Sequence, residues 1–331
     1  MAIFTAPTYR LGACLMKGEE VPVTIVVTTP GSRASEGWAA ALASQCPQWN
    51  VLVWDGRSAV AADYAVVWRP AGAFFKSVTG LRAVFNLGAG VDALLALPEF
   101  PGALPVIRLE DAGMGRQMVE YVVHGLVHVS RRFDDYLQQN NDRQWRPLPA
   151  IDYAQWPVGV LGLGTIGAQV AQAVASLGYP VNGWSRTPRT LPGVHCFSGP
   201  ESLSDFLRST RVLVNVLPLT PETANLFDRH TLGRLLPDAY VINVGRGEHL
   251  VDDDLLFLLQ NGRLRGALLD VFRTEPLPDG HPFWAHPRIR ITPHIAAMTL
   301  KQESSRQITR KIASLERGEP VSGLVQRDRG Y

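Results

Sequence analysis

Short apolar runs alternate with longer segments of helical periodicity along almost the whole chain. A short run of aliphatic residues closed by turn residues is typical of a strand buried on both faces of a sheet. In the first third, such runs predict strands at Val23–Thr28, Val51–Trp54, Tyr64–Trp68, Ala83–Leu87 and Val106–Arg108. Further on, they predict strands at Val158–Leu163, Val181–Trp184, Val212–Leu217, Tyr240–Val244, Gly266–Val271 and Arg290–Thr292. Strands that alternate with helices in this way predict parallel sheets.

Helical periodicity is clearest in three segments. Apolar residues recur at helical spacing in Glu36–Ser44, Gly115–Asn140 and Leu300–Arg317. The segment Gly115–Asn140 has the broadest apolar face, so we expect this helix to lie in a buried interface. The polar, proline-bearing stretch Asn140–Pro157 follows it and is expected to cross between domains.

The order of these elements predicts the fold class and the domains. A chain of 331 residues is long enough for about two domains. We expect an α/β protein with two Rossmann-like, doubly wound parallel-sheet domains and the cleft between them. The expected divisions are a loose N-terminal extension at 1–20, a substrate domain at 21–114 plus 301–331, and an NAD(P)-binding domain at 115–300 that begins with the linking helix.

The composition excludes several classes of protein. The 32 Lys and Arg nearly balance the 30 Asp and Glu, which argues against the basic stripe of a nucleic-acid binder. The three cysteines, Cys14, Cys46 and Cys196, have no paired spacing, so we expect no disulfide framework and a cytoplasmic location. The uncharged run Tyr153–Ser185 contains Gln, Asn and Pro residues, and it predicts two strands joined by a helix rather than a membrane span.

The sharpest local signal is a glycine-rich turn. Gly162-Leu163-Gly164-Thr165-Ile166-Gly167 directly follows a predicted strand and opens a predicted helix. In that context GxGxxG is a dinucleotide-binding fingerprint, because its glycines permit the tight turn, the approach of the pyrophosphate and close helix–strand packing. The anion would then meet the N–H groups at the helix N-terminus. A glycine-rich turn without a ligand is the alternative.

The next predicted strand indicates which dinucleotide is bound. An NAD enzyme usually places Asp or Glu there for the ribose 2′-hydroxyl. Here the strand is followed by Ser185, Arg186, Thr187 and Arg189, with no acidic residue. Arginine presents a fork of donors that suits a phosphate, so we expect NADPH to be preferred over NADH. A solvated basic turn is the alternative.

Three further segments begin where predicted strands end. They are Asn243-Val244-Gly245-Arg246-Gly247, Asp270-Val271-Phe272-Arg273-Thr274-Glu275-Pro276-Leu277 and Thr292-Pro293-His294-Ile295-Ala296-Ala297. Ligands of open α/β sheets bind beyond the carboxyl ends of the strands. These segments are therefore candidates for one site.

Together with Leu217-Pro218-Leu219-Thr220-Pro221-Glu222-Thr223 and Asn86-Leu87-Gly88-Ala89-Gly90-Val91-Asp92, these segments resemble the D-isomer-specific 2-hydroxyacid dehydrogenase family. The likeness covers nearly everything after residue 20. Within the family it is closest to the branch that reduces glyoxylate and hydroxypyruvate, through Leu109–Gly115, Arg131–Tyr136, Trp184–Thr187 and Arg329–Tyr331. The resemblance implies an NADPH-dependent enzyme that reduces small 2-oxo acids, glyoxylate to glycolate and hydroxypyruvate to D-glycerate. It also implies a homodimer.

The resemblance implies catalytic roles that the chemistry of the side chains supports. Arg246 would bind the substrate carboxylate and polarise the carbonyl group. His294 would protonate the carbonyl oxygen, and Glu275 would pair with His294 and favour the imidazolium. Further cofactor contacts are expected from residues near the strand ends, namely Leu217, Pro218, Thr223, Val244, Gly245 and Asp270.

The substrate carboxylate is expected to meet the first domain as well. In Leu87-Gly88-Ala89-Gly90, small residues let consecutive N–H groups converge into an anion nest, although a plain turn would look the same. Trp68 and Met114 are candidates for pocket walls, with core packing as the alternative. Trp145 could reach the cleft of a neighbouring subunit.

Other interpretations of the sequence stay open. His124 and His128 have the helical spacing of metal ligands, but no third ligand is evident, so we expect packing residues and no metal. The chain could instead be a non-catalytic dinucleotide-sensing regulator on the same scaffold. It could also be a dehydrogenase for another D-2-hydroxy acid.

Overall fold

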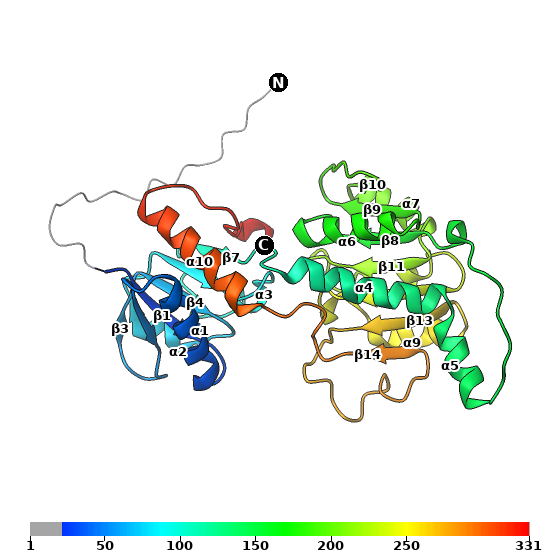
Figure 1. The fold of residues 1–331 in the computed structure, drawn as a ribbon, viewed down its shortest axis with the longest axis horizontal. Helices are drawn as coiled ribbons and strands as arrows, with labels where there is room; N and C mark the ends of the chain where they lie inside the picture. Colours follow the sequence, from blue (N-terminus) through cyan, green and yellow to red (C-terminus); the bar gives the residue numbers. More distant parts are fainter. Residues whose placement is uncertain (1–21, 331) are drawn as a thin grey trace, which may run out of the picture. The chain divides into compact units, whose positions relative to one another are not determined.

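The computed structural model describes residues 22–330 of the chain. The expected extension at residues 1–20 lies outside the described residues. The described chain divides into two compact units (Figure 1): residues up to Leu109 with Lys301–Gln326, and Glu110–Leu300 with the segment from Arg327 onward. Residues 110–114 and the segment after Gln326 thus group with the second unit, whereas the sequence interpretation assigned them to the first.

The first unit is built on a five-stranded parallel sheet in the order β2-β1-β4-β6-β7. Its strands are β1 (Thr24–Thr28), β2 (Asn50–Val53), β4 (Tyr64–Val67), β6 (Ala83–Asn86) and β7 (Val106–Arg108). A separate pair joins β3 (Val60–Ala61) to β5 (Val78–Thr79). The strand order reverses between β1 and β4, which is the switch point where doubly wound sheets bind ligands.

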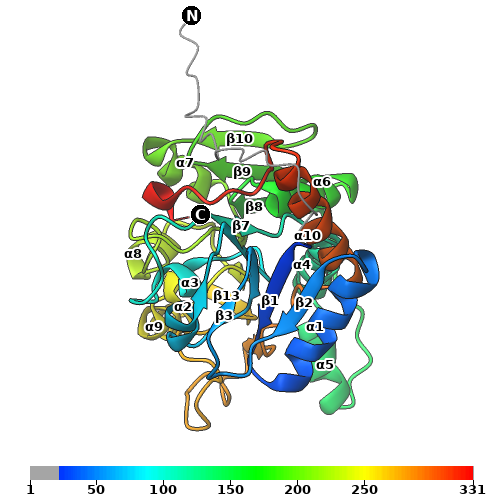
Figure 2. The same cartoon turned by 90° about the vertical axis from the view of Figure 1, so that its left-hand side faces the viewer.

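Helices from both ends of the described chain cover this sheet. α1 (Ser32–Gln45) packs against α10 (Lys301–Glu316). Figure 2 shows these two helices to the right of the strands, with α2 (Ala73–Ser77) and α3 (Asp92–Leu95) to the left. The Glu316 carboxylate at the end of α10 binds Arg82 at 2.7 Å and also the Tyr64 hydroxyl. The last helix is thereby fixed to the first sheet.

The second unit contains a seven-stranded parallel sheet in the order β10-β9-β8-β11-β12-β13-β14. Its strands are β8 (Val158–Leu161), β9 (Val181–Ser185), β10 (His195–Ser198), β11 (Val212–Asn215), β12 (Ala239–Asn243), β13 (Leu264–Leu269) and β14 (Ile289–Ile291). The order reverses between β8 and β11, as in dinucleotide-binding sheets. The two parallel sheets confirm the predicted α/β class.

Both faces of the second sheet carry helices, which are α4 (Met114–Ser130) and α6 (Thr165–Ser176) on one face and α7 (Leu203–Arg208), α8 (Arg229–Leu232) and α9 (Asp252–Gln260) on the other. Leu126 of α4 and Val170 of α6 share one buried cluster, while Leu255 of α9 belongs to another. Successive residues Val241 and Ile242 of β12 point into opposite clusters. This two-sided burial is why the strands are continuous apolar runs in the sequence.

The prediction of one helix over Gly115–Asn140 is wrong, because the structure has two. α4 ends at Ser130, and α5 begins only at Phe133 and runs to Asn141. Between them Arg132 adopts a left-handed conformation with φ 58°, which stops the first helix and redirects the chain. No Gly or Pro marks this break in the sequence.

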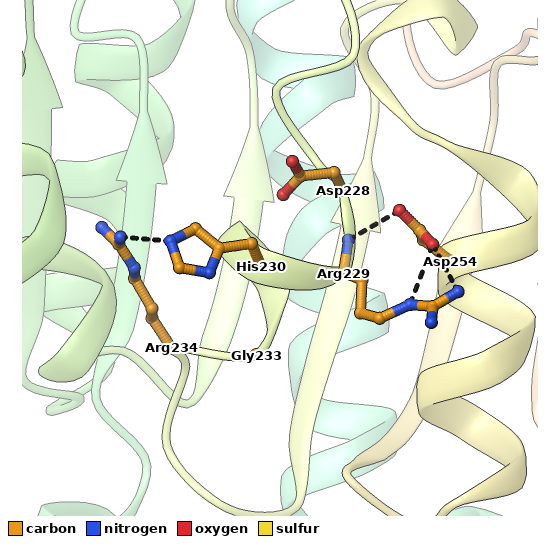
Figure 3. Close-up of a pocket in the computed structure, with 6 residues that line it drawn as sticks. All are labelled: Asp228, Arg229, His230, Gly233, Arg234 and Asp254. Atoms are coloured by element: carbon orange, nitrogen blue, oxygen red, sulfur yellow. Dashed lines mark hydrogen bonds and ion pairs between the residues drawn. The ribbon is translucent and has the colours of Figure 1, made fainter.

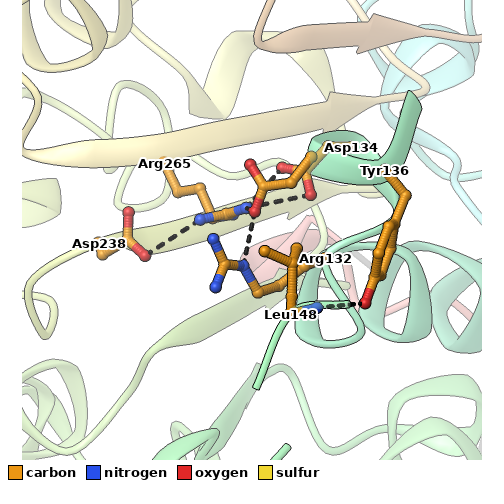
Figure 4. A network of polar contacts seen from close by, with 7 residues as sticks. Arg132, Asp134, Tyr136, Leu148, Asp238 and Arg265 are labelled. Carbon is orange, nitrogen blue, oxygen red and sulfur yellow. Dashed lines mark hydrogen bonds and ion pairs between the residues drawn. The ribbon is translucent and has the colours of Figure 1, made fainter. Parts of the chain in front are cut away.

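A polar network holds α5 against the sheet (Figure 4). Arg265 of β13 binds the carboxylates of Asp134 and Asp135, each at 2.9 Å, and Asp135 also binds Arg132 at 2.6 Å. Burial alone would lower the pKa of Arg265, but the two carboxylates raise it above its ordinary value, so the guanidinium stays charged. The Tyr136 hydroxyl accepts a hydrogen bond from the Leu148 amide at 2.9 Å, which ties the following loop to α5.

Within residues 22–330, no helix is both long enough and apolar enough to cross a bilayer.

Candidate functional site

The glycine-rich turn joins β8 to α6 with a distinct role for each glycine. Gly162 has φ 98°, and a Cβ there would lie 2.9 Å from the Val216 carbonyl oxygen. A Cβ at Gly167 would lie 1.7 Å from the Gly162 oxygen, so only glycine fits. A Cβ at Gly164 would meet no atom within 4 Å. The turn is therefore tightly packed at Gly162 and Gly167, and open space lies over Gly164.

The N-terminus of α6 suits an anion. Gly164 and Thr165 are exposed there, and the helix that follows is long enough to carry a full dipole. Ile166 is half-buried and Leu163 is buried under Gly183 of β9, so these two residues pack rather than face solvent. The residues present fit a dinucleotide pyrophosphate.

The turn after β9 is basic and exposed. Ser185 is buried, and its Oγ donates a 2.7 Å hydrogen bond to the Thr187 carbonyl, so this hydroxyl shapes the turn. Arg186, Thr187 and Arg189 are exposed. Glu222 has a lowered pKa, first through hydrogen bonding to Thr220 and, more weakly, through the charge of Arg186. Arg186 is thus within electrostatic reach of the loop that follows β11.

His294 and Glu275 form a direct pair. The imidazole Nδ1 lies 2.9 Å from Glu275 Oε2 and 3.1 Å from Oε1. Glu275 Oε1 also accepts the Phe272 amide at 3.2 Å, which fixes the carboxylate on its own loop. The side chains are 40% and 23% exposed, so the pair lies at the surface of this unit. Because Nδ1 faces the carboxylate, Nε2 is the ring nitrogen available to a substrate.

The loop that carries His294 is held by Asp270. His294 has φ 56°, and its amide donates to the Asp270 carbonyl at 2.9 Å. The Asp270 carboxylate, which is 1% exposed, accepts the Thr292 hydroxyl at 2.6 Å and the amides of Ile295 and Ala296 at 2.8 Å each. Asp270 was predicted as a cofactor contact, and in this structure its carboxylate organises the loop that carries His294.

Arg246 follows β12 and is half-buried. Its Nη1 donates to the Gly245 carbonyl at 2.8 Å. A Cβ on the next residue, Gly247, would lie 1.9 Å from the Phe272 carbonyl carbon, so this turn packs directly against the loop that carries Glu275. Val244 and Gly245 are buried at the strand end, which makes them part of the floor of the turn.

A buried polar network beneath Arg246 was not predicted from the sequence. It consists of Asn215, Asn243 and His249, each 0% exposed. Asn215 and Asn243 are the last residues of neighbouring strands and are joined by a 2.8 Å hydrogen bond. Amide side chains at the ends of two otherwise apolar strands were the available signal. The loop Leu217–Thr223 is tied to the same network, since the Leu217 amide donates to Asn215 Oδ1 at 3.1 Å.

The structure therefore places the expected residues of the second unit along one edge of its sheet. Ser185 is the last residue of β9, and Gly162, Leu217, Val244, Asp270 and Thr292 follow the carboxyl ends of β8, β11, β12, β13 and β14. All these strands are parallel, so their carboxyl ends form one edge. Pro218 and Thr223 lie in the loop after β11, where Thr223 Oγ1 donates to the Pro218 carbonyl at 2.8 Å.

The candidate residues of the first unit also gather at a strand end. A Cβ at Gly88 would lie 2.5 Å from Trp68 Cζ3, so the indole packs on this glycine. Asn86 Nδ2 donates to the carbonyls of Gly88 and Gly90, at 3.2 and 2.8 Å. In a trans peptide the N–H points away from the preceding carbonyl, so the amide of Ala89 faces away from Asn86. Leu87 is buried beside this turn.

Met114 is 4% exposed and begins α4, so it belongs to the second unit.

His128 is also buried on α4, and burial, followed by the charge of Arg290, lowers its pKa. His124 is exposed, and the two rings lie 6.1 Å apart. Among residues 22–330, no three His, Cys, Asp or Glu side chains gather as a metal-binding group.

A surface pocket lies elsewhere on the second unit, between α8 and α9 (Figure 3). Its lining residues are Asp228, Arg229, His230, Gly233, Arg234 and Asp254. Arg229 forms an ion pair with Asp254 at 2.9 Å, and Arg234 Nη2 lies 2.5 Å from His230 Nε2. None of the predicted site residues lines it.

Comparison with known proteins identifies the family. Residues 123–296 match the model of the D-isomer specific 2-hydroxyacid dehydrogenase NAD binding domain. The chain is 46% identical over 299 residues to glyoxylate/hydroxypyruvate reductase A of Escherichia fergusonii, an alignment that covers 89% of this chain and 96% of that protein.

Solved structures give the same result. A D-isomer specific 2-hydroxyacid dehydrogenase from Xanthobacter autotrophicus Py2, in complex with NADPH and MES, is 37% identical with a TM-score of 0.89 and covers 94% of this chain and 100% of that one. An NADPH-dependent glyoxylate/hydroxypyruvate reductase from Sinorhizobium meliloti, with NADP and sulfate, is 33% identical with a TM-score of 0.88 and covers 93% and 100%. The chain belongs to the D-isomer specific 2-hydroxyacid dehydrogenase family.

Proposed function

We propose that this enzyme uses NADPH to reduce small 2-oxo acids, converting glyoxylate to glycolate and hydroxypyruvate to D-glycerate. The proposal rests on the His294–Glu275 pair, joined at 2.9 Å on the sheet edge that also carries the glycine-rich turn and Arg246. It is supported by relatives named as glyoxylate/hydroxypyruvate reductases that match nearly the whole chain.

In the proposed mechanism, Arg246 binds the substrate carboxylate through its guanidinium fork and polarises the carbonyl group. His294 donates a proton from Nε2 to the carbonyl oxygen. Glu275 holds the imidazole at Nδ1, which keeps Nε2 directed outward. NADPH, when bound, supplies the hydride to the carbonyl carbon, so substrate, hydride and one proton give the 2-hydroxy acid and NADP⁺.

We propose that the substrate carboxylate also meets the amides of Leu87, Gly88, Ala89 and Gly90, with Trp68 and Met114 as walls of the substrate pocket. Converging amides form an anion nest, and an aromatic wall excludes water around the reacting carbonyl. In the first unit, Gly88 and Trp68 pack in direct contact, which supports a shared role.

The cofactor is assigned to the edge between β9 and β13. Gly162, Leu163, Gly164, Thr165, Ile166 and Gly167 would hold the pyrophosphate, and Ser185, Arg186, Thr187 and Arg189 the 2′-phosphate. Leu217, Pro218, Thr223, Val244, Gly245 and Asp270 would line the remainder of the groove. The exposed guanidinium groups of Arg186 and Arg189, with no acidic residue beside them in the turn, favour NADPH over NADH.

We further propose that the enzyme is a cytoplasmic homodimer. The α5 segment and the loop after it expose several large apolar side chains, including Phe133, Tyr136, Leu137 and Trp145, the last at 98% exposure. An apolar cluster of this kind marks an interaction surface. Light scattering during gel filtration tests the proposal, because a monomeric mass at micromolar concentration contradicts it.

The decisive experiment for the reaction is a substrate panel. Glyoxylate, hydroxypyruvate, pyruvate and 2-oxoisovalerate are assayed side by side with NADPH and with NADH. We expect the first two substrates with NADPH to give the highest kcat/KM. Tight NADPH binding without turnover of any 2-oxo acid would instead indicate a dinucleotide-sensing regulator. A higher kcat/KM for pyruvate or 2-oxoisovalerate would indicate a dehydrogenase for another D-2-hydroxy acid.

A further inference from the structure

A buried imidazole lies directly beneath the arginine assigned to the substrate carboxylate. His249 closes the short 3-10 turn Gly247–His249 and is 0% exposed. Its Nδ1 lies 3.1 Å from the Arg246 amide nitrogen and 2.8 Å from Asn215 Nδ2. Its Nε2 lies 3.2 Å from the Pro218 carbonyl oxygen. One ring thus connects the arginine turn to the loop after β11.

The backbone amides around this ring determine which atoms donate. The amide of Leu217 must donate to Asn215 at 3.1 Å, which identifies the accepting atom of that side chain as Oδ1 and leaves Nδ2 as a donor. The amide of Gly245 likewise donates to Asn243 Oδ1 at 3.2 Å. Nδ1 of His249 therefore faces two N–H donors and must accept, while Nε2 faces a carbonyl and must carry the hydrogen.

Both backbone groups of Arg246 are held by this network. The amide donates to His249 Nδ1, and the carbonyl accepts Asn243 Nδ2 at 3.0 Å and the His249 amide at 3.3 Å. The peptide units on either side of Arg246 are therefore fixed, and with them the direction of its Cα–Cβ bond. A guanidinium that binds a carboxylate through two parallel hydrogen bonds needs such a fixed origin, because small misplacements of a reacting group are costly.

We propose that His249 is a positioning residue: as a neutral imidazole that accepts at Nδ1, it sets the backbone of Arg246 and so aims the guanidinium at the substrate carboxylate. The inference rests on the proposed function, in which Arg246 binds that carboxylate. It goes further because His249 is fully buried and is assigned a role through its protein partners alone. The ring also packs against Phe227, with centroids 6.2 Å apart, so its polar and its packing roles are separable by substitution.

Three substitutions test which atom matters. His249→Asn keeps an acceptor close to the position of Nδ1, whereas His249→Gln keeps a donor close to Nε2 only. His249→Phe removes both and retains an aromatic ring against Phe227. We expect His249→Phe and His249→Gln to lower kcat/KM for glyoxylate by about 10- to 100-fold, mainly through a higher KM, and to weaken inhibition by oxamate similarly. His249→Asn should recover kcat/KM to within about threefold of the parent.

Controls separate positioning from general damage. Leu258→Ala truncates a buried side chain of α9 outside the network, so it should lower the melting temperature while leaving KM unchanged. Equal loss in the Asn and Phe variants, or a parental KM in the Phe variant, would overturn the proposal. An effect on the dissociation constant of NADPH alone would also overturn the proposal, because it would indicate that His249 acts on the cofactor groove through Pro218 and not on Arg246. If the Phe variant does not fold, the Asn and Gln variants decide between the two nitrogens.

Arg246→Ala distinguishes this inference from the function on which it rests. Loss of activity in Arg246→Ala combined with a parental KM in His249→Gln refutes only the positioning role. Full activity in Arg246→Ala refutes the assigned role of the arginine itself, whatever the His249 variants do.

Discussion

Gly164→Ala should separate cofactor binding from folding. Gly164 has φ −72° and ψ −167°, an extended conformation open to alanine, and a Cβ there would meet no heavy atom within 4 Å. Replacing a glycine at a permissive position stabilises a protein by about 0.4–1 kcal/mol, because the unfolded chain loses freedom. We therefore expect the melting temperature of Gly164→Ala to be unchanged or slightly raised.

The same substitution should weaken NADPH binding. The new methyl group fills the open space over the N-terminus of α6, where the pyrophosphate is expected to meet the backbone N–H groups. A hydrogen bond to a charged group contributes about 1.5–3 kcal/mol, so losing one raises the Kd of NADPH roughly 10- to 100-fold. Titration of NADPH fluorescence against the variant measures the effect directly.

Two other glycines provide the comparison. Gly102 is equally open but lies in the first unit, so Gly102→Ala should change neither the melting temperature nor the Kd of NADPH. Gly167→Ala should change both, because its Cβ would lie 1.7 Å from the Gly162 carbonyl oxygen and α6 would have to move. A Kd for Gly164→Ala that equals the values of the parent and of Gly102→Ala would refute the placement of the pyrophosphate.

Outcomes are expected for four further substitutions. Arg186→Ala should lower the preference for NADPH over NADH by roughly 10-fold or more, mainly by raising the KM of NADPH. A variant with the parental kcat/KM for both cofactors would contradict the 2′-phosphate assignment. His294→Ala should lower kcat by roughly 10²–10⁴-fold while NADPH binding stays intact. Glu275→Gln removes the carboxylate that holds Nδ1 of His294 at 2.9 Å, so it should also lower kcat, and a parental kcat would leave Glu275 a purely structural residue. Partial burial raises the pKa of Asp135, but the hydrogen bonds from Arg132 and Arg265 outweigh it and leave the pKa below its ordinary value. The stability from that carboxylate is therefore present above the ordinary pKa of about 4 and is lost as the pH falls through the lowered pKa. Asp135→Asn should lower the melting temperature at pH 7, and the difference from the parent should vanish once the pH is below the lowered pKa.

The strands and the strand-end motifs could be predicted because each is encoded locally. Strands such as β8 and β11 are buried on both faces, and the apolar run that this burial requires is visible in any short window of sequence. The glycine-rich turn is equally local, since Gly167 and the oxygen it would strike at Gly162 are close in sequence. The pairing of His294 with Glu275 was expected from the family resemblance, and the two side chains do meet at 2.9 Å.

Features decided by distant residues could not be predicted in this way. The helical periodicity continues across the break between α4 and α5. The residues that hold α5 in its own direction include Arg265, which binds Asp134 and Asp135 from a strand far along the chain. The role of Asp270 depends on a loop that begins only after β14. His249 gave no signal either, because its partners at Asn215 and Arg246 are recognisable only once neighbouring strands are aligned.

The first unit is assembled from both ends of the described chain, and this has a consequence for biosynthesis. α10 packs on α1, and Leu324 bridges to Ile107 of β7, so this unit is completed only by residues made after Glu110–Leu300 of the second unit. During translation, a contiguous insert of the second unit separates the two parts, and chains generally fold in units from the N-terminus as they emerge. The surface of α1 that packs on α10 is therefore uncovered until residues 301–316 leave the ribosome. A nascent chain stalled before that point exposes the α1 surface that α10 normally covers, and transiently exposed apolar surface promotes aggregation.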